Sequence, residues 1–448
     1  MSTTINPSVL PSTISSMQPI HTDDSSIIIN QSLELEGQAT LSGAKNAVLV
    51  IIASLILTEG KSILYNVPNS DDVLQMITLM RELGAHITFD SSNNTLEVET
   101  SFIAHYKVSP PLMKKMRASV LVMGPLLARF SRAEIAVPGG CVIGDRPIDY
   151  HLRNFEKMGV MFTVDGEFLS CVTPNLKATT LVLDYPSVGA TENLLMAAAL
   201  THGITRIINA ALEPEVFDLI TVLTKMGARI SLETPATIII EGVEKLKPIK
   251  HQIIADRLEA GALLLAAAIT GGSIYLPQAR ADQLDVFLLK LHEMGHHIET
   301  DSKTFGIRLQ ATKTPRAVSF TTAPYPGFPT DLQAPMMAAQ CLANGKSKIH
   351  ETVFENRLLH VRELQKMGAQ IAVRGDRALV TGVDTLYGTS VIATDIRASC
   401  ALVLSGLAAR GTTIMTGINH WKRGYETLEK KLAQLGASIN VQKITQKS

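Results

Sequence analysis

Apolar stretches with helical spacing alternate along this chain with short β-branched segments, and the alternation repeats. In each repeat a helix-like stretch ends at a Leu-Gly or Met-Gly turn and is followed by a strand-like segment. The glycines of these six turns lie 68 to 75 residues apart and are Gly84, Gly159, Gly227, Gly295, Gly368 and Gly436. A period of this length indicates that one supersecondary unit was copied along the chain. We therefore expect the chemistry at positions where the repeat is broken.

The third repeat displays the unit most clearly. Its predicted elements are, in chain order, a helix over 194–200, a strand over 205–208, a helix over 215–226 and two strands over 228–232 and 236–240. The second helix is amphipathic, and Gly227 suits the left-handed position that ends a helix. Because the other repeats keep this order, the sequence predicts an α/β protein of two domains with three repeats each. Ala-rich helices favour a buried helical layer with sheets outside, and we place the domain boundary near residues 254–257.

Composition and charge exclude several classes of protein. Lys and Arg number 41, as do Asp and Glu, so no global field attracts nucleic acid or an anionic membrane. The longest mainly apolar run, Ala47 to Leu57, is too short to cross a bilayer, which needs about 20 residues. Residues 1–26 are rich in Ser, Thr and Pro and lack Lys and Arg, which predicts a disordered extension rather than a targeting signal.

Four cysteines in 448 residues, with no metal-binding spacing, predict reduced thiols in the cytosol. Cys341 and Cys400 lie in apolar helix patterns and are expected to be packing residues. Cys141 differs, because it lies in a loop over 137–149 that contains three glycines and two prolines. The neighbouring Arg146 favours a reactive thiolate and Asp145 opposes it. A catalytic and an incidental cysteine therefore both remain open on composition alone.

Three cations begin helices at equivalent places in different repeats. Lys45, followed by Asn46, heads the first apolar helix, and Arg117 and Arg397 head those of the second and sixth repeats. Backbone N–H groups at a helix start help to hold an anion, so the three cations could share one anionic ligand. Solvated cations at turns are the alternative. Asp331, at a proline-defined turn, is either a helix cap or a general base.

Eight segments, in order between about Ile27 and Ile439, resemble motifs of the UDP-N-acetylglucosamine 1-carboxyvinyltransferase family. These enolpyruvyl transferases act in bacterial peptidoglycan synthesis. The segments are Leu41–Ala47, Met116–Ser119, Pro138–Pro147, Ser187–Asn193, Phe328–Gln333, Phe354–Arg357, Asp395–Ser399 and Arg423–Glu426. The related shikimate-pathway synthase shares the fold, but its own motifs have no counterpart in this chain.

The resemblance implies a two-domain inside-out α/β barrel built from six repeats of a βαβαββ-type unit. The first domain would span 45–255 and carry the Cys141 loop, and the second would span 27–44 plus 256–448 and carry Asp331. The implied reaction transfers the enolpyruvyl group of phosphoenolpyruvate to the 3-hydroxyl of UDP-N-acetylglucosamine and releases phosphate. Neither a metal nor an organic cofactor is expected. The oligomeric state stays open.

The resemblance also assigns roles to residues. Asp331 would be the general base, and Cys141 the proton donor that can also form an adduct with phosphoenolpyruvate. Lys45, Arg146 and Arg397 would hold the phosphate and carboxylate groups, and Asn46 would order their site. The remaining implied substrate contacts are Arg117, Pro147, Ile148, Asp149, Tyr150, Ser187, Val188, Gly189, Val353 and Arg357. Arg146 and Asp331 would also contact the UDP-sugar.

Two departures from the family pattern motivate an alternative function. Asp145 stands where a small residue is usual, and Tyr185 precedes the Ser187 segment where a basic residue is common. A paralogue that binds UDP-sugar with little turnover is therefore one alternative. An RNA 3′-phosphate cyclase, which uses similar repeats, is another, although the neutral charge balance disfavours it.

Overall fold

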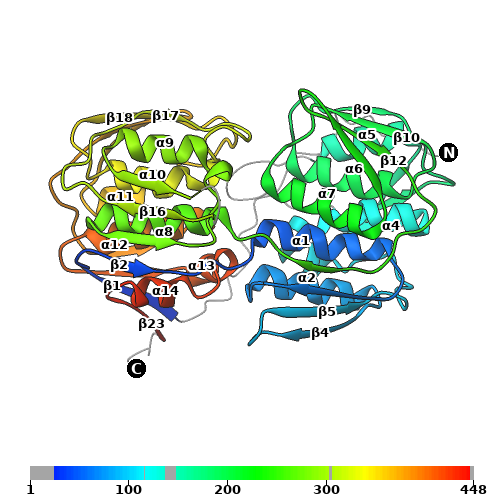
Figure 1. The fold of residues 1–448 in the computed structure, drawn as a ribbon, viewed down its shortest axis with the longest axis horizontal. Coiled ribbons are helices and arrows are strands. Elements are labelled where there is room, and N and C mark those ends of the chain that lie inside the picture. The colour runs from blue at the N-terminus through cyan, green and yellow to red at the C-terminus, as the bar shows by residue number, and fades with distance from the viewer. Residues whose placement is uncertain (1–24, 116, 137–147, 302–304, 444–448) are drawn as a thin grey trace. The chain divides into compact units, whose positions relative to one another are not determined.

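The fold is that of a computed structural model, which describes residues 25–115, 117–136, 148–301 and 305–443. The chain divides into two compact units (Figure 1). Of the described residues, unit 1 contains 43–115, 117–136 and 148–254, and unit 2 contains 25–42, 255–301 and 305–443. Each unit has a hydrophobic core of its own.

The described residues of unit 1 form three sheets and a set of helices. Its sheets, in order of neighbouring strands, are β13 (Lys250–Gln252), β3 (Lys61–Tyr65), β5 (Thr95–Glu99) and β4 (His86–Asp90); β6 (Arg132–Ala136), β8 (Phe168–Val172) and β7 (Met161–Asp165); and β11 (Arg229–Glu233), β12 (Thr237–Glu241), β10 (Ile204–Ile208) and β9 (Thr180–Val182). Its helices are α1 (Lys45–Ser54), η1 (Leu55–Leu57), α2 (Asp71–Glu82), α3 (Pro110–Lys115), η2 (Arg117–Val122), α4 (Met123–Phe130), α5 (Asp149–Lys157), α6 (Val188–Ala199) and α7 (Pro214–Met226).

Three sheets are also formed by the part of unit 2 that the structure describes. They are β21 (Ser390–Ile392), β22 (Thr412–Thr416), β1 (Ser25–Asn30) and β23 (Ile439–Lys443); β15 (His297–Thr300), β16 (Ile307–Gln310), β14 (Ser273–Leu276) and β2 (Glu36–Gln38); and β17 (Phe320–Thr321), β18 (Lys346–His350), β20 (Arg377–Thr381) and β19 (Gln370–Arg374). Its helices are α8 (Arg257–Thr270), η3 (Ala281–Gln283), α9 (Asp285–Glu293), η4 (Thr330–Leu332), α10 (Gln333–Gln340), α11 (Val361–Lys366), α12 (Ile396–Ala408), α13 (Ile418–Gly424) and α14 (Leu428–Gln434).

The third repeat folds as its pattern predicts. Helix α6 leads into β10, and α7 ends at Gly227, whose φ of 112° lies in the left-handed region that a side chain disfavours. Strands β11 and β12 then pair antiparallel, with Ile230 opposite Ile240. Alternate residues of β12 are buried, as expected for a sheet with one face on a core. The predicted order of helix, strand, helix, strand, strand is confirmed.

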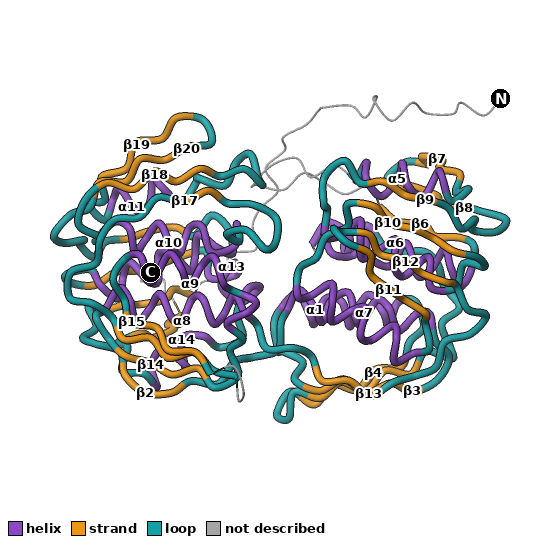
Figure 2. Tube along the Cα trace, turned by 45° about the horizontal axis from the view of Figure 1, so that its top comes forward, coloured by secondary structure: helices purple, strands orange, loops and turns teal. Residues whose placement is uncertain are grey.

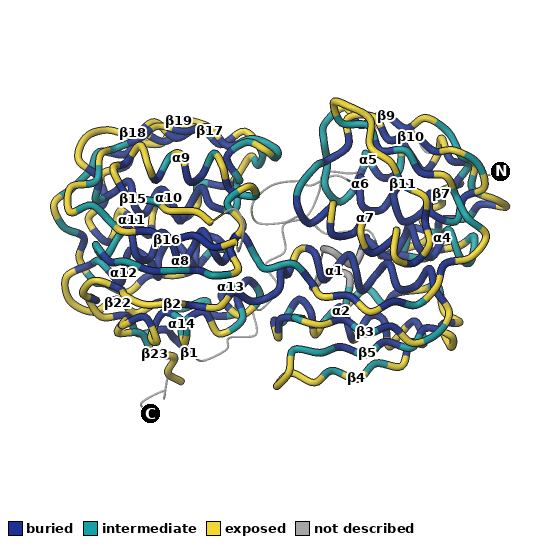
Figure 3. The backbone as a smooth tube through the Cα atoms, in the orientation of Figure 1, coloured by how far each residue is buried: buried dark blue, intermediate teal, exposed yellow. Residues whose placement is uncertain are grey.

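The innermost helices are buried around their whole circumference. In α8 every residue from Arg257 to Ala268 is buried, and in α12 every residue from Arg397 to Leu407 is buried (Figure 3). Their apolar and small residues let α8 pack against α12 and α12 against α10. In each unit the sheets lie outside such helices (Figure 2). The predicted α/β class with buried helices and outer sheets is confirmed.

Strands from both ends of the described chain meet in one sheet of unit 2. Strand β1 pairs antiparallel with β22 on one side and with β23 on the other. Ser25 and Ser26 lie in β1 and are buried, although they fall within the range expected for a disordered extension. The other residues expected there, 1–24, lie outside the described residues. Across the described ranges, no helix is both long and apolar enough to span a membrane.

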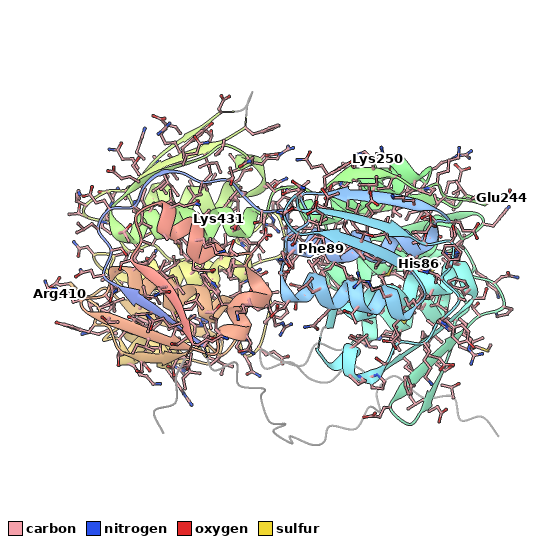
Figure 4. All side chains as sticks on the ribbon, turned by 90° about the horizontal axis from the view of Figure 1, so that it is seen from below. His86, Phe89, Glu244, Lys250, Arg410 and Lys431 are labelled. Atoms are coloured by element: carbon pink, nitrogen blue, oxygen red, sulfur yellow. The ribbon has the colours of Figure 1, made fainter. Side chains whose placement is uncertain are left out.

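A buried ionic cluster lies where the chain leaves and re-enters unit 2. The Asp256 N–H donates to the Ser42 carbonyl at 2.9 Å, which ties the two crossing segments together. Glu259 of α8 accepts from the Ser42 N–H at 2.6 Å and from Lys431 of α14 (labelled in Figure 4) at 2.7 Å. The Ser42 hydroxyl donates to Glu426 at 2.8 Å. Burial raises the pKa of Glu259 from 4.5 to about 7, although the Lys431 charge acts in the opposite direction.

This raised pKa gives a testable pH dependence of stability. Between about pH 4.5 and pH 7 the folded protein keeps a proton on Glu259 that the unfolded chain has released, so the contribution of Glu259 to stability falls as the pH rises. Glu259→Gln removes this loss. We therefore expect the unfolding free energy of the variant, relative to wild type, to increase by about 3 kcal/mol across this window.

The single tryptophan provides the measurement. Trp421 is buried in α13 of unit 2, so its fluorescence during urea unfolding follows that unit. Exposed Glu36 of β2, in the same unit, supplies the control, because Glu36→Gln changes no buried carboxyl group and should not reproduce the pH-dependent gain of Glu259→Gln. Parallel stability–pH curves for wild type and Glu259→Gln would refute a proton held by Glu259.

Candidate active site

Asp331 lies at the centre of an ion-pair cluster in unit 2, between two buried arginines. It lies in η4, which runs directly into α10. Its Oδ1 accepts from Nη2 of Arg357 at 2.5 Å, and its Oδ2 accepts from Nη2 of Arg397 at 2.9 Å. The Asp331 side chain is 23% exposed, whereas the two arginine side chains are 4% and 7% exposed. The carboxylate is therefore the accessible member of the cluster.

Helix α12 places Arg397. The carboxylate of Asp395 caps this helix by accepting from the Arg397 N–H at 2.8 Å and the Ala398 N–H at 2.9 Å. The cap fixes the helix start, so the Arg397 guanidinium reaches Asp331 and also donates to the hydroxyl of Tyr425 at 3.0 Å. Burial opposes the charge on Arg397, but the Asp331 carboxylate more than compensates and raises the pKa of Arg397.

The loop after β18 places Arg357. Its guanidinium lies 5.1 Å from the centre of the Phe354 ring, within the range of a cation–π contact. The planar group thus has an aromatic face against it and the Asp331 carboxylate at its edge. Val353, which precedes this ring, is half-buried, and its N–H donates to Glu351 at 2.9 Å.

The two arginines control the protonation of Asp331. Burial alone would raise the pKa of Asp331, but the charges of Arg397 and Arg357 outweigh it and hold that pKa far below its ordinary value. The carboxylate is ionised at any physiological pH. Chemically, the cluster combines a potential proton acceptor with two cations that can bind an anion.

Unit 1 holds a second buried pair. Lys45 begins α1, and its ammonium donates to Asp72, in the first turn of α2, at 3.0 Å. Both side chains are almost fully buried, at 11% and 5% exposure. A lysine held in this way is pre-oriented, and its compact charge suits a phosphate or carboxylate ligand. Asn46 follows it and is exposed.

Six other predicted residues of unit 1 lie at two helix starts. Ile148, Asp149 and Tyr150 lie at the start of α5, where Asp149 pairs with Arg153 at 3.1 Å. Ser187 caps α6 and accepts from the Ala190 N–H at 3.4 Å, and Val188 and Gly189 form the first turn of that helix. A Cβ added to Gly189 would lie 3.5 Å from the ring of buried His151. The starts of α5 and α6 are thus in contact.

Several predicted residues have no described side chain. Cys141, Arg146 and Pro147 lie outside the described residues. Arg117 begins η2, and nothing of its side chain is described. Among the described cysteines, burial raises the pKa of Cys171 and Cys341 to about 12 and that of Cys400 to about 11. These three thiols remain protonated, which confirms the packing role predicted for Cys341 and Cys400.

The structure brings together Asp331, Arg357 and Arg397 in unit 2, whereas Lys45 belongs to unit 1 and has a carboxylate partner there. The residues predicted from the sequence did not include Asp72, Tyr425, Glu351 and His360. Burial lowers the pKa of His360 to about 4, so this imidazole is neutral at physiological pH. Tyr425 could have been found, because it lies in one of the family motifs; Asp72 gives no such signal. In the described ranges no group of three or more His, Cys, Asp or Glu could hold a metal ion.

Comparison with known proteins identifies the relatives of this chain. The family model described as EPSP synthase (3-phosphoshikimate 1-carboxyvinyltransferase) matches residues 29–432. A UDP-N-acetylglucosamine 1-carboxyvinyltransferase of Xylella fastidiosa (strain M12) is 46% identical over 421 residues, which are 93% of this chain and 99% of the relative. One of Coxiella burnetii (strain Dugway 5J108-111) is 47% identical over 414 residues, 92% of this chain and 95% of the relative.

Solved structures of two other proteins have the same fold as this chain. The enolpyruvyl transferase NikO from Streptomyces tendae superposes with a TM-score of 0.84 at 25% identity, over 93% of this chain and 98% of NikO. EPSP synthase from Acinetobacter baumannii superposes with a TM-score of 0.73 at 17% identity, over 93% of this chain and all of that chain, and it supports the fold alone. The predicted two-domain enolpyruvyl transferase fold is confirmed.

Proposed function

This chain belongs to the UDP-N-acetylglucosamine 1-carboxyvinyltransferases of the EPSP synthase family, and from that membership we propose how it performs the reaction. It transfers the enolpyruvyl group of phosphoenolpyruvate to the 3-hydroxyl of UDP-N-acetylglucosamine and releases phosphate. This step serves peptidoglycan synthesis. The observation that carries the mechanism is the accessible Asp331 carboxylate held between two buried arginines.

Addition and elimination both require proton transfer. In the addition, the sugar oxygen bonds to C2 of phosphoenolpyruvate, the hydroxyl proton passes to a base, and C3 gains a proton from an acid. In the elimination, C3 loses a proton, the bond from C2 to the phosphate oxygen breaks, and the double bond returns. We assign the base to Asp331. The acid role of Cys141 rests on the family resemblance.

The arginines explain how a weakly basic carboxylate can act as that base. While both guanidinium groups face Asp331, its pKa is far too low for efficient proton abstraction. An anionic substrate that binds Arg397 competes with Asp331 for this guanidinium group. The Asp331 carboxylate is then less stabilised by Arg397, and its pKa rises. Phosphoenolpyruvate would therefore increase the basicity of Asp331 as it binds.

The remaining candidate residues bind substrate in this proposal. Lys45 and Arg146 hold charged groups of phosphoenolpyruvate, with Asn46 beside Lys45. Arg117, the Pro147 to Tyr150 segment and the start of α6 from Ser187 to Gly189 contact the UDP-sugar, as do Val353 and Arg357. Helix starts with free N–H groups suit the phosphates of such a ligand. We also place the enzyme in the cytoplasm, where both substrates would be available.

Phosphate release measured with each substrate omitted in turn tests the function. The purified protein should release phosphate when both substrates are present and only background amounts when either is absent. Absence of release under these conditions, with UDP-N-acetylglucosamine binding intact in calorimetry, would instead support the paralogue without turnover. No observation in the described residues favours that alternative.

A further inference from the structure

Glu351 is the common acceptor of a hydrogen-bond network that includes Thr330, the residue before Asp331. It directly follows β18, the strand that lies between β17 and β20, and it is 2% exposed. Its Oε1 accepts from the Thr322 hydroxyl at 3.0 Å and from the N–H groups of Val353 and Phe354 at 2.9 and 3.1 Å. Its Oε2 accepts from the Thr330 hydroxyl at 2.9 Å. One buried carboxylate thus receives four donors.

The donors come from three separate segments of unit 2. Thr322 follows β17, Thr330 begins η4, and Val353 and Phe354 belong to the loop after β18. Thr322 reinforces the arrangement, because its hydroxyl accepts from the Thr352 N–H at 2.9 Å. Buried polar groups that are fully paired fix a single local geometry.

Two of these segments carry the two ends of the Asp331–Arg357 ion pair. Thr330 is the residue before Asp331, and Phe354 supplies the ring against which Arg357 lies. The Glu351 carboxylate therefore joins the turn that carries the base to the loop that carries its cation. Loss of this tie would leave each partner free to move relative to the other.

We propose that Glu351 is a positioning residue that fixes Asp331 and Arg357 relative to one another for catalysis. The proposal rests on the function assigned above, with Asp331 as base. Glu351 does not touch the reacting groups; it acts through Thr330 on one side and through Val353 and Phe354 on the other. Misplacement of a catalytic group by about 1 Å costs about 10²-fold in rate.

A pair of substitutions tests the proposal. Glu351→Ala removes all four acceptor contacts, and kcat is expected to fall by about 10²-fold. Glu351→Gln should recover most of this loss, because its amide oxygen can accept from Thr322, Val353 and Phe354 while its NH₂ donates to the Thr330 hydroxyl. Exposed Glu299 on β15 gives the control, and Glu299→Ala should match wild type.

The pH profile separates positioning from simple loss of folded protein. In Glu351→Ala the weakened hold of Arg357 should raise the pKa of Asp331, so the acidic limb of kcat should move to higher pH. Misfolding would instead lower the active fraction and leave that limb in place. If Glu351→Ala does not fold, Thr330→Val removes one donor alone, and Thr330→Ser restores it; kcat should fall in the first variant and recover in the second.

The outcomes distinguish the two proposals. Wild-type protein without phosphate release would overturn the proposed function. Active wild type with unchanged kcat and pH profile in Glu351→Ala would overturn the positioning role. Hydrogen exchange at the Val353 and Phe354 amides adds a readout independent of turnover, and unchanged protection of both in Glu351→Ala would also count against the role.

Discussion

Asp331→Asn is expected to lower kcat for phosphate release by about 10²- to 10⁴-fold, the range that general base catalysis contributes. Asparagine keeps the shape of the side chain and one acceptor oxygen, but it cannot take up the hydroxyl proton. The loss should appear in kcat, and saturating phosphoenolpyruvate should not restore the rate, because the missing interaction belongs to the chemical step.

The same substitution should strengthen anion binding although it lowers kcat. Arg357 and Arg397 lose the carboxylate that neutralises them, and both are nearly buried. An anion supplied from solution then has two guanidinium groups to bind without competition from Asp331. We therefore expect phosphoenolpyruvate or inorganic phosphate to bind Asp331→Asn more tightly than wild type. Removal of one partner from buried pairs also costs about 3–5 kcal/mol of stability without such an anion.

Steady-state kinetics and calorimetric titration with phosphate measure both effects. Asp376→Asn is the matched control, because Asp376 is exposed in the hairpin between β19 and β20 and pairs with His350 at 2.9 Å. It should leave kcat and phosphate affinity unchanged. Near-normal kcat in folded Asp331→Asn would remove Asp331 from the role of base.

The fold was predictable because its signals are local and repeated. Gly227 ends α7 in the left-handed region, and β11 and β12 show the alternation of a half-buried hairpin. Each such signal lies within a few residues of the element that it specifies, and the repeats present it several times. The signal for the start of α12 is equally local, because the Asp395 carboxylate accepts from the N–H groups of Arg397 and Ala398.

The contact partners of the candidate site residues could not be predicted from local signals. Asp331 pairs with residues 26 and 66 positions away, and Lys45 pairs with Asp72, 27 positions away. Nothing in the local pattern around Asp72 or Glu351 separates them from solvated acids at helix or strand ends. Their burial and their contacts arise only when elements that are separated along the chain pack together. Resemblance to a family indicated Asp331 and Arg397, but it did not indicate the network that holds them.

The second large effect is expected in Arg397→Lys. The lysine keeps a positive charge, but it lacks the planar group that contacts Asp331 and Tyr425 together. Loss of a well-oriented donor to developing charge costs about 10²- to 10³-fold, so kcat/KM for phosphoenolpyruvate should fall by that amount. The effect on KM for UDP-N-acetylglucosamine should be much smaller, because Arg397 is assigned to the other substrate.

The pH profile gives Arg397→Lys a signature of its own. Arg397 contributes the largest of the charge effects that keep the pKa of Asp331 low, and a flexible ammonium replaces it poorly. The pKa of Asp331 therefore rises in the variant, the carboxylate becomes protonated at a higher pH, and activity should be lost earlier on the acidic side. Arg410, exposed at the edge of unit 2 (Figure 4), supplies the control, and Arg410→Lys should keep the wild-type profile. An acidic limb that stays in place in Arg397→Lys would show that Arg397 does not set the basicity of Asp331, and the proposed increase in basicity on substrate binding would fail with it.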